Sequence, residues 1–544
     1  MRSSIIAVVP FLPALALSAC FDLSSDSHDT SDSRDTSDAH DTSDSDDAEP
    51  DVPTGPVSLY LRWQSGVSDP LIDAFVLAPP AIDPFAGRLS VCAYRDSRGV
   101  AITSAHLNGT VVSFTVDAHS ACIGIALDRD ALPVDAVLDV IADGVTVHGV
   151  IPTPPPTATH AFDALARGQV LWIATASAGL IGVDADGAFI AYDGVLATEP
   201  FDPEAPRPQS NLVLALAPAG DRAMWVGTAV TGVSWFDPGP DPLRAEDDQW
   251  RHGQPQATSK YGAEFAQTPL AIAADPFAPD VAWVATLNGV YRAEKTSDAV
   301  VFERVLDGVA TAIEIDAVGR VWCGFSTTTH LSVSADEGDS KVALPWAEDA
   351  LVVFDPGADR VLSPNEERIT ALPNEGAVTA LAADARGVWI GTPYELLHGT
   401  TDDDHVALAT MLDTSALDDL AVVDLLASPS GVWVATRSEC ESNRGRLLEL
   451  RVDEAAANLS ANAVTSVSDL SEHGFGERDF AKIGLQPSGR LWVSTFVGEI
   501  PNSFLAKDTT ATARGCDQPK ASERSADLYL LDETGTAQPI RPKP

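Results

Sequence analysis

Short runs of alternating apolar and polar residues fill most of the chain from residue 57 onward. The first group covers 57–61, 89–94, 111–116, 122–127 and 136–140, with Gly, Asp and Pro between the runs. A period of two predicts strands with one buried face, and short strands separated by turn residues are typical of a β-sandwich. We therefore predict a small β-sandwich-like domain over residues 53–151, followed by a Pro-rich linker at 152–157.

One apolar strand then recurs seven times, each time with tryptophan as its second residue. A small residue generally stands two positions after the tryptophan, and threonine usually follows it; the fourth copy departs most, with Cys323 and Phe325. An apolar strand and a tight turn precede most copies. The seven tryptophans are Trp172, Trp225, Trp283, Trp322, Trp389, Trp433 and Trp492.

These units resemble two-component regulator propeller repeats over roughly residues 158–540. One four-stranded sheet cannot bury both faces alone, and propellers close with about four to eight blades. Seven copies therefore predict a seven-bladed β-propeller over 158–544. The predicted fold class is all-β, with the propeller preceded by the small β-sandwich domain and a disordered acidic tether. We expect the tryptophans to pack between blades, because the small residues beside them let neighbouring sheets approach closely.

The first twenty residues have the pattern of a secretory signal. Arg2 is followed by an apolar run from Ile5 to Leu17 that is too short to span a membrane, and then by Ser18-Ala19-Cys20. This ending resembles that of bacterial lipoproteins, which implies a signal peptide at 1–19 and lipid attachment at Cys20. Phe21, rather than Asp, follows the cysteine, and the resemblance then favours outer-membrane sorting, with the surface or periplasmic side left open.

Residues 20–52 form the predicted tether. Aspartate recurs at every third position from Asp26 to Asp47, so the segment is strongly acidic and lacks the apolar residues of a core. The whole chain has 34 Lys+Arg against 79 Asp+Glu, a net charge of −45. A nucleic-acid partner is therefore not expected, because phosphate binding needs clustered basic residues. Contact with the membrane is expected through the N-terminal lipid.

The six cysteines divide into two candidate pairs and two single residues. An exported protein favours disulfides, and Cys92 and Cys122 lie on two predicted strands, so they are one candidate pair. Cys440 and Cys516 both follow the tryptophan strand in neighbouring blades and are the second candidate pair. Cys323 lies within a tryptophan strand and is expected to be a buried free thiol. Cys20 is the lipidated residue.

No catalytic constellation stands out in the sequence, and we predict no cofactor, no metal site and no catalytic residues. The strands expected to line the propeller axis consist mostly of Ala, Leu, Ile and Val. Asp163, Glu314 and Asp424 are isolated polar residues there, with strand-end or hydrogen-bonding roles as the simpler interpretation. Enzymatic propellers need converging histidines or carboxylates around the axis. Convergence of these three would favour an enzyme.

The long connections are predicted to gather at one end of the propeller. They are 193–210, 253–267, 362–376 and 454–478 between blades, and 326–349 and 496–525 within blades. Long loops in a compact domain are commonly functional. Possible binding residues in or beside these loops are Trp250, Tyr261, Trp346 and His473, which would stack on sugars or anchor a partner; local packing is the alternative.

The sequence thus favours a lipid-anchored protein of the cell envelope that acts as a non-catalytic binding or scaffolding module for a glycan or protein. Two alternatives remain open. One is a metal-assisted propeller lyase or hydrolase. The other is an extracytoplasmic sensor component without its own kinase, which the resemblance to regulator propellers implies.

Overall fold

The structure is a computed structural model of the 544-residue chain. It describes residues 60–64, 88–95, 98–116, 122–127, 136–151, 161–175, 178–194, 201–210, 212–229, 231–256, 267–326, 330–333, 340–343, 351–357, 367–370, 372, 377–401, 405–413, 420–437, 445–453, 459–471, 475, 479–486, 488–496, 528–532 and 536–540. The predicted signal peptide, Cys20, the tether and the linker at 152–157 lie outside these ranges. Within them, no helix has the length and apolar character that crossing a membrane requires.

The N-terminal strands form two antiparallel sheets. The first has the order β1 (Tyr60–Gln64), β2 (Arg88–Arg95), β7 (Cys122–Ala126), β6 (Thr115–Val116), with β3 (Arg98–Gly99) also paired to β2. The second has the order β5 (Thr110–Val111), β4 (Ile102–Leu107), β8 (Ala136–Ala142), β9 (Val145–Ile151).

One core of buried residues joins these two sheets and confirms the sandwich. Val91 and Ile123 from the first sheet belong to the same cluster as Ala105, Leu138 and Val140 from the second. The single strand predicted at 111–116 is wrong, because the chain leaves the second sheet after β5 and enters the first at β6.

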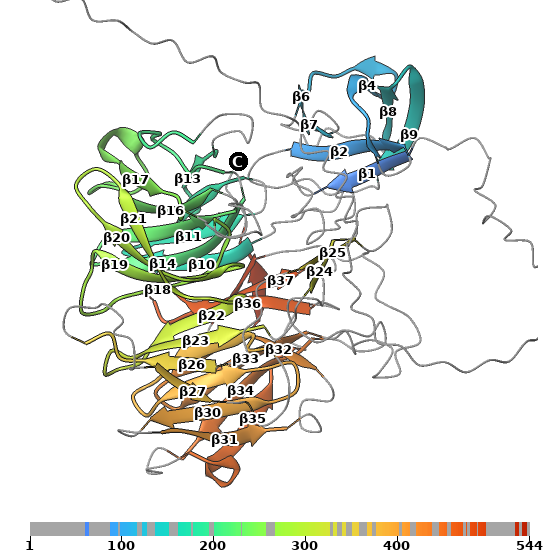
Figure 1. Cartoon of the computed structure of the whole chain (residues 1–544). Coiled ribbons are helices and arrows are strands. Elements are labelled where there is room, and N and C mark those ends of the chain that lie inside the picture. Colours follow the sequence, from blue (N-terminus) through green and yellow to red (C-terminus); the bar gives the residue numbers. More distant parts are fainter. Residues whose placement is uncertain are drawn as a thin grey trace, which may run out of the picture. The chain divides into compact units, whose positions relative to one another are not determined.

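Seven further four-stranded antiparallel sheets follow, and in each sheet the four strands pair in the order in which they occur in the chain (Figure 1). We name the sheets blades 1 to 7 and the strands of each blade A to D in chain order. Blade 1 is β10 (Ala161–Arg167), β11 (Val170–Thr175), β12 (Leu180–Asp184) and β13 (Phe189–Tyr192). Blade 2 is β14 (Val213–Ala219), β15 (Ala223–Thr228), β16 (Gly232–Asp237) and β17 (Gln249–Gly253). Blade 3 is β18 (Pro269–Ala274), β19 (Val281–Thr286), β20 (Gly289–Lys295) and β21 (Val300–Leu306).

The remaining blades repeat this order. Blade 4 is β22 (Ala310–Ile315), β23 (Val321–Phe325), β26 (Leu351–Phe354) and β27 (Glu367–Thr370), with the hairpin β24 (His330–Val333) and β25 (Ser340–Ala343) inserted between B and C. Blade 5 is β28 (Ala380–Ala383), β29 (Val388–Gly391), β30 (Leu396–Thr401) and β31 (Val406–Leu412). Blade 6 is β32 (Ala421–Ser428), β33 (Gly431–Arg437), β34 (Leu447–Val452) and β35 (Val464–Asp469), and blade 7 is β36 (Asp479–Leu485), β37 (Leu491–Phe496), β38 (Leu528–Leu531) and β39 (Ala537–Pro539). Two short 3-10 helices, η2 (Ala245–Asp247) and η3 (Ala461–Ala463), lie in connections.

The A strands form a closed inner ring, which confirms a seven-bladed propeller. Each A strand lies beside the A strand of the next blade, and β36 of blade 7 lies beside β10 of blade 1. All four strands of blade 7 come from the C-terminal part of the chain. The ring therefore closes by side-chain packing between the first and last blades, not by a strand exchanged between them.

The repeat tryptophans pack between blades, as the sequence predicts. Trp172, Trp225, Trp283, Trp322 and Trp389 have no exposed surface, and Trp492 is 2% exposed. Trp172 of blade 1 lies in one cluster with side chains of blade 2, and Trp492 of blade 7 lies in one cluster with side chains of blade 1. Trp433 is only half-buried but still packs against the cluster between blades 6 and 7.

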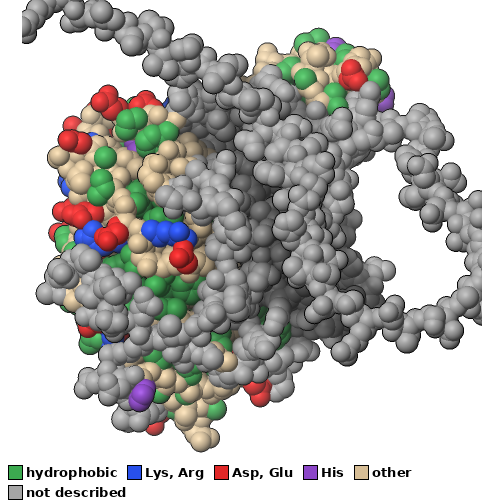
Figure 2. Space-filling model, viewed as in Figure 1, with side chains coloured by type: hydrophobic (Ala, Val, Ile, Leu, Met, Phe, Trp, Pro, Cys, Tyr) green, Lys and Arg blue, Asp and Glu red, His purple; other side chains and the backbone are tan. Residues whose placement is uncertain are grey.

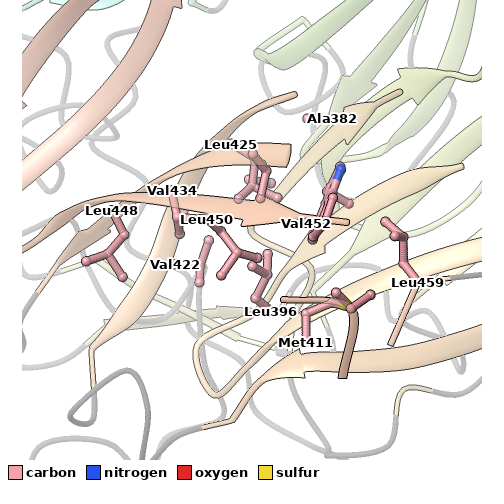
Figure 3. Packing of buried hydrophobic residues seen from close by; sticks show 14 residues of the cluster. Ala382, Leu396, Met411, Val422, Leu425, Val434, Leu448, Leu450, Val452 and Leu459 are labelled. Carbon is pink, nitrogen blue, oxygen red and sulfur yellow. The ribbon is translucent and has the colours of Figure 1, made fainter. Parts of the chain in front are cut away.

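Figure 3 shows one of these interfaces, between blades 5 and 6. Leu396 and Met411 of blade 5 pack against Val422, Leu450 and Val452 of blade 6, so the core of the ring is a series of such inter-blade layers. Burial of this apolar surface between blades is the main favourable contribution to closing the ring.

The small residue after each tryptophan lets the next blade approach. A Cβ atom added to Gly324 would lie 2.4 Å from Cγ1 of Val378, and one added to Gly391 would lie 2.5 Å from Cγ1 of Val422. Both valines belong to the start of the next blade. The repeat therefore needs a small side chain at this position for a packing reason.

An aspartate in several A–B turns fixes the tryptophan from the other side. In blade 5, Asp384 Oδ1 accepts the backbone N–H groups of Arg386 and Gly387, and its Oδ2 accepts the indole N–H of Trp389 at 3.2 Å. Asp275 and Asp316 accept the indole N–H of the tryptophan in blades 3 and 4 in the same way. One carboxylate thus closes the turn and orients the core side chain.

We expect Asp384→Ala to lower the free energy of unfolding by about 2–3 kcal/mol, because it leaves partly buried N–H donors without their acceptor. Urea unfolding of the purified chain, followed by tryptophan fluorescence, measures the change. The matched control is Asp280→Ala, whose carboxylate is 62% exposed and pairs only with Lys295, so its effect should stay below about 0.5 kcal/mol. Equal losses in the two variants would contradict a specific role for the turn aspartate.

Candidate functional site

Charged side chains occupy one level of the inner ring in three consecutive blades. This level is the A-strand position that pairs with the small residue of strand B. In blades 2 to 5 it holds only alanine: Ala215, Ala271, Ala312 and Ala380. In blades 6, 7 and 1 it holds Asp424, Lys482 and Asp163. Because blade 7 closes onto blade 1, a lysine lies between two aspartates around the ring.

Lys482 and Asp424 form a hydrogen-bonded ion pair. Lys482 Nζ donates a hydrogen bond to Asp424 Oδ1 at 3.0 Å, and the backbone N–H of Ile483 donates to Asp424 Oδ2 at 2.8 Å. The Lys482 side chain is 35% exposed and that of Asp424 is 10% exposed. The ion pair therefore joins blades 6 and 7 while the lysine still has accessible surface.

Asp163 joins blades 1 and 2 by a similar contact. Its Oδ2 accepts the backbone N–H of Leu216 in blade 2 at 2.8 Å, and its Oδ1 accepts the N–H of Ala164, also at 2.8 Å. Both carboxylate oxygens are thus held by backbone donors. The sequence suggested a hydrogen-bonding role for the isolated polar residues of these strands, and this role is confirmed for Asp163 and Asp424.

Glu314 lies on β22 of blade 4, at the next level of the ring, where it pairs with Trp322. Its Oε1 accepts the N–H of Ile315 at 2.9 Å. We call Asp163, Glu314, Asp424 and Lys482 the axial charge cluster. The four residues come from the inner strands of blades 1, 4, 6 and 7, and Asp424, Asp163 and Glu314 all favour the charged form of Lys482.

The electrostatic balance of the cluster is unequal, since one ammonium group faces three carboxyl groups. Burial raises the pKa of Asp163 to about 6, although Lys482 and two N–H donors oppose this shift. Burial likewise raises the pKa of Glu314 to about 7, against the effects of the Ile315 N–H and Lys482. Burial lowers the pKa of Lys482, but Asp424 and Asp163 outweigh it and the net shift is upward. Near pH 7 the lysine is therefore charged, Asp163 is mostly ionised and Glu314 is about half ionised.

A ring of half-buried side chains precedes the charged level. Most A strands contain a register shift, or β-bulge, one residue before that level. The residues at this point are Phe162, Leu214, Leu270, Thr311, Thr379, Val423 and Ala481, all half-buried. The two threonine hydroxyls donate to carbonyl groups of the next blade. We call these seven residues the bulge collar, and five of them are apolar.

The other predicted site residues have mixed outcomes. Trp250 does not belong to a loop: it lies in β17, is 6% exposed and stacks on Phe236 with 4.0 Å between ring centroids. It therefore belongs to the core between blades 1 and 2. Tyr261, Trp346, His473, Cys440 and Cys516 lie outside the described residues.

The two remaining cysteine predictions concern described residues. Cys323 is a buried free thiol, as predicted, and burial raises its pKa. Cys92 and Cys122 are direct partners in the register of β2 and β7, but their side chains lie outside the described set. Their disulfide stays a prediction.

The prediction that all long connections share one end of the propeller is partly wrong. Strand D of blade 6 is β35, so residues 453–463 join C to D and lie at the A–B end, and the same holds for 355–366 in blade 4. Residues 193–212 and 254–268 between blades, and 326–350 and 497–527 between B and C, do share the other end. That end is called the loop-rich end below.

Lys482 was not among the residues that the sequence pattern singled out. A signal was present in the sequence. Lys482 precedes its repeat tryptophan, Trp492, by ten residues, close to the nine residues between Asp424 and Trp433, and it is charged where most blades have alanine.

Within the described ranges, no group of three or more His, Cys, Asp or Glu residues is placed to hold a metal ion.

Comparisons with known proteins give structural likeness only. No protein-family profile and no curated protein sequence matches the chain. Among solved structures, the extracellular domain of a hybrid two-component system, BT4673 from B. thetaiotaomicron, is 13% identical, with 71% of this chain and 45% of that chain covered and a TM-score of 0.40. U3-55K is 9% identical, with 68% and 95% covered and a TM-score of 0.43.

A third structure is YCF48 from Cyanidioschyzon merolae, which is 13% identical, with 62% of this chain and 94% of that chain covered and a TM-score of 0.38. The chain spans less than half the length of the B. thetaiotaomicron domain, 45% in one structure and 37% in another. At these values the likeness carries no information about ligand or activity.

We expect Glu314→Gln to stabilise the protein above pH 7 and to leave its stability nearly unchanged at pH 4. Because the pKa of Glu314 is raised in the folded protein, the contribution of its protonated form to native stability is fully present below the unfolded pKa of 4.5 and is lost as the pH rises through about 7. The gain at pH 8 is at most about 3 kcal/mol, and glutamine retains the carbonyl that accepts the Ile315 N–H. Thermal unfolding from pH 4 to 8, with the exposed Glu303→Gln as control, measures it. Parallel pH profiles for native protein and Glu314→Gln would contradict the raised pKa.

Proposed function

We propose that this protein is an exported, lipid-anchored envelope protein whose propeller acts as a non-catalytic binding or scaffolding module for a glycan or protein. The observation that supports the proposal best is the grouping of four long connections, 193–212, 254–268, 326–350 and 497–527, at the loop-rich end. A rigid ring that presents long connections at one end suits recognition, since loops on a rigid scaffold carry binding residues.

The charge of the surface limits the choice of ligand. Acidic side chains are spread over several parts of the visible face of the propeller (Figure 2), in keeping with the net charge of −45. A polyanionic ligand would be repelled at long range, whereas a neutral glycan or a basic protein surface would not. The proposed ligand classes are therefore neutral or basic.

A second candidate function, a lyase or hydrolase acting at the axis, is favoured by the axial charge cluster. Two carboxyl groups of the inner ring with pKa values of about 6 and 7 match the needs of general acid–base catalysis near neutral pH. Asp163 and Asp424 also accept backbone N–H groups of the next blade, a structural role that a non-catalytic propeller needs as much as an enzyme does. We therefore rank the enzyme second.

The test is thermal unfolding of the purified chain with a panel of neutral oligosaccharides, with and without EDTA. A ligand present at a hundred times its dissociation constant adds about 2.7 kcal/mol to native stability. The binding module predicts a glycan-dependent rise in melting temperature that EDTA leaves unchanged and that deletion of residues 334–339, between β24 and β25, reduces. Chain shortening of the panel sugars by mass spectrometry, lost in Asp163→Asn, would favour the enzyme instead.

The lipid anchor has its own test. When the full chain is expressed in a Gram-negative bacterium, Cys20→Ser should move the protein from the membrane fraction to the soluble fraction, because the acyl chains supply about 0.8 kcal/mol per buried methylene. Mass spectrometry of the N-terminal peptide should show diacylglyceryl mass on Cys20 only in the unsubstituted protein. An unchanged membrane fraction would count against the anchor.

A further inference from the structure

One of the long connections at the loop-rich end is packed onto blade 2. Residues 201–210 of the connection 193–212 contain no strand, yet Ala205 and Gln209 are both buried. The side-chain amide of Gln209 accepts the N–H of Asp202 at 3.2 Å and donates to the Asp202 carbonyl at 2.7 Å, which closes the segment on itself. We call residues 201–210 the docked segment.

A histidine of blade 2 holds the docked segment by a hydrogen bond. Nε2 of His252, on β17, lies 2.8 Å from the carbonyl oxygen of Ala205, and Nδ1 lies 2.6 Å from Oγ of Ser234 on β16. A carbonyl oxygen only accepts hydrogen bonds, so Nε2 carries the proton and Nδ1 accepts the hydroxyl of Ser234. The neutral imidazole thus satisfies both of its nitrogen atoms, one of them with the backbone of the docked segment.

A second proton on the imidazole does not suit this arrangement. It would occupy Nδ1 and point at the Ser234 hydroxyl, whose own proton would then need another acceptor. His252 and Ser234 are each 1% exposed, so water does not supply that acceptor while the segment is docked. Protonation therefore costs both a buried charge and a lost hydrogen bond.

The charged groups around His252 do not remove this cost. Burial lowers the pKa of His252, and the neighbouring Arg251 adds to the effect. The Ala205 carbonyl and the carboxylate of Asp202 oppose the shift without reversing it. Trp250 stacks on the imidazole with 5.7 Å between ring centroids and has no titratable group.

Release of the docked segment would let water reach the imidazole, so the released state takes up a proton more readily. In water the imidazole has its ordinary pKa of 6.5, whereas its pKa in the docked state is lower. The contribution of the neutral histidine to docking is therefore fully present above pH 6.5. It is lost as the pH falls from 6.5 through the lower pKa of the docked state.

We propose that His252 is a pH-sensitive latch of the loop-rich end, whose hydrogen bond to the Ala205 carbonyl holds the docked segment on blade 2 at neutral pH and whose protonation releases that segment. The inference rests on the proposed function, because the docked segment belongs to the connections that are proposed to recognise a ligand. The latch itself is a property of the unliganded protein, so it is tested without a ligand.

Hydrogen exchange of the purified chain at pH 8 and pH 5, followed by mass spectrometry, tests the latch. The protection factor of peptides that cover 201–210, which corrects for the intrinsic pH dependence of exchange, should fall at least about threefold at pH 5. Peptides that cover β15 of the same blade should keep their protection. Equal protection of 201–210 at the two pH values would overturn the proposal, and so would a parallel loss in β15, which would mean general destabilisation by acid.

Two variants separate His252 from other effects of acid. His252→Gln keeps an amide N–H for the Ala205 carbonyl but does not titrate, so protection of 201–210 should differ by less than about twofold between pH 8 and pH 5. His252→Phe keeps an aromatic ring but has no donor, so protection should be low at both pH values. The matched control, His148→Gln, changes a 70% exposed histidine of the N-terminal sandwich and should retain the pH dependence of the native protein.

A native-like pH dependence in His252→Gln would contradict the latch. Unfolding curves check that each variant is folded, and His252→Phe serves if His252→Gln is not. The comparison of 201–210 with β15 in the native protein stands without either variant.

The exchange experiment and the oligosaccharide experiment fail independently. A glycan-dependent rise in melting temperature, together with pH-independent protection of 201–210, overturns the latch and leaves the binding module. Acid-dependent release of 201–210, without a response to any oligosaccharide, supports the latch and counts against glycan recognition at the loop-rich end.

Discussion

The packing of each strand B onto the following blade is the constraint on which the rest of the structure depends. A tryptophan fills the space between two sheets, and two positions later a glycine, alanine or serine lets the next A strand come close. The two requirements act together, because the bulky ring separates the sheets at one point and the small residue brings them together at the next. A single blade satisfies neither requirement, so the stability of the ring is a property of neighbouring pairs.

That constraint also determines what happens at the axis. The close approach places the backbone of one A strand within hydrogen-bond reach of side chains on the preceding one, as with Asp163 and Leu216 or Asp424 and Ile483. Thr311 and Thr379 make the corresponding contact through their hydroxyl groups. Polar side chains are therefore tolerated at the inner ring because the bulges expose backbone groups that need partners. The charged cluster is built on the same contacts that hold the blades together.

Most of the architecture could be predicted from the sequence, because one short strand with a fixed internal spacing recurs and carries both the number and the order of the blades. The D strands were harder. In β35 most residues are exposed and the apolar pattern is weak, so the segment looked like a loop. In β17 the buried Trp250 and His252 do alternate with Gln249 and Arg251, but a strand this short gives only a weak signal in the sequence.

Lys482 shows why the candidate site was less predictable than the fold. Its own strand gives no reason to single it out, and its partners lie in blades 6 and 1. The sequence separates Asp163 from Lys482 by almost the whole propeller, and only closure of blade 7 onto blade 1 makes the two neighbours around the ring. The axial charge cluster therefore exists only in the closed ring. Burying three carboxyl groups with one lysine opposes that closure, and Asp163 and Glu314 lower this cost by taking up protons as the pH falls below about 6 and about 7, respectively.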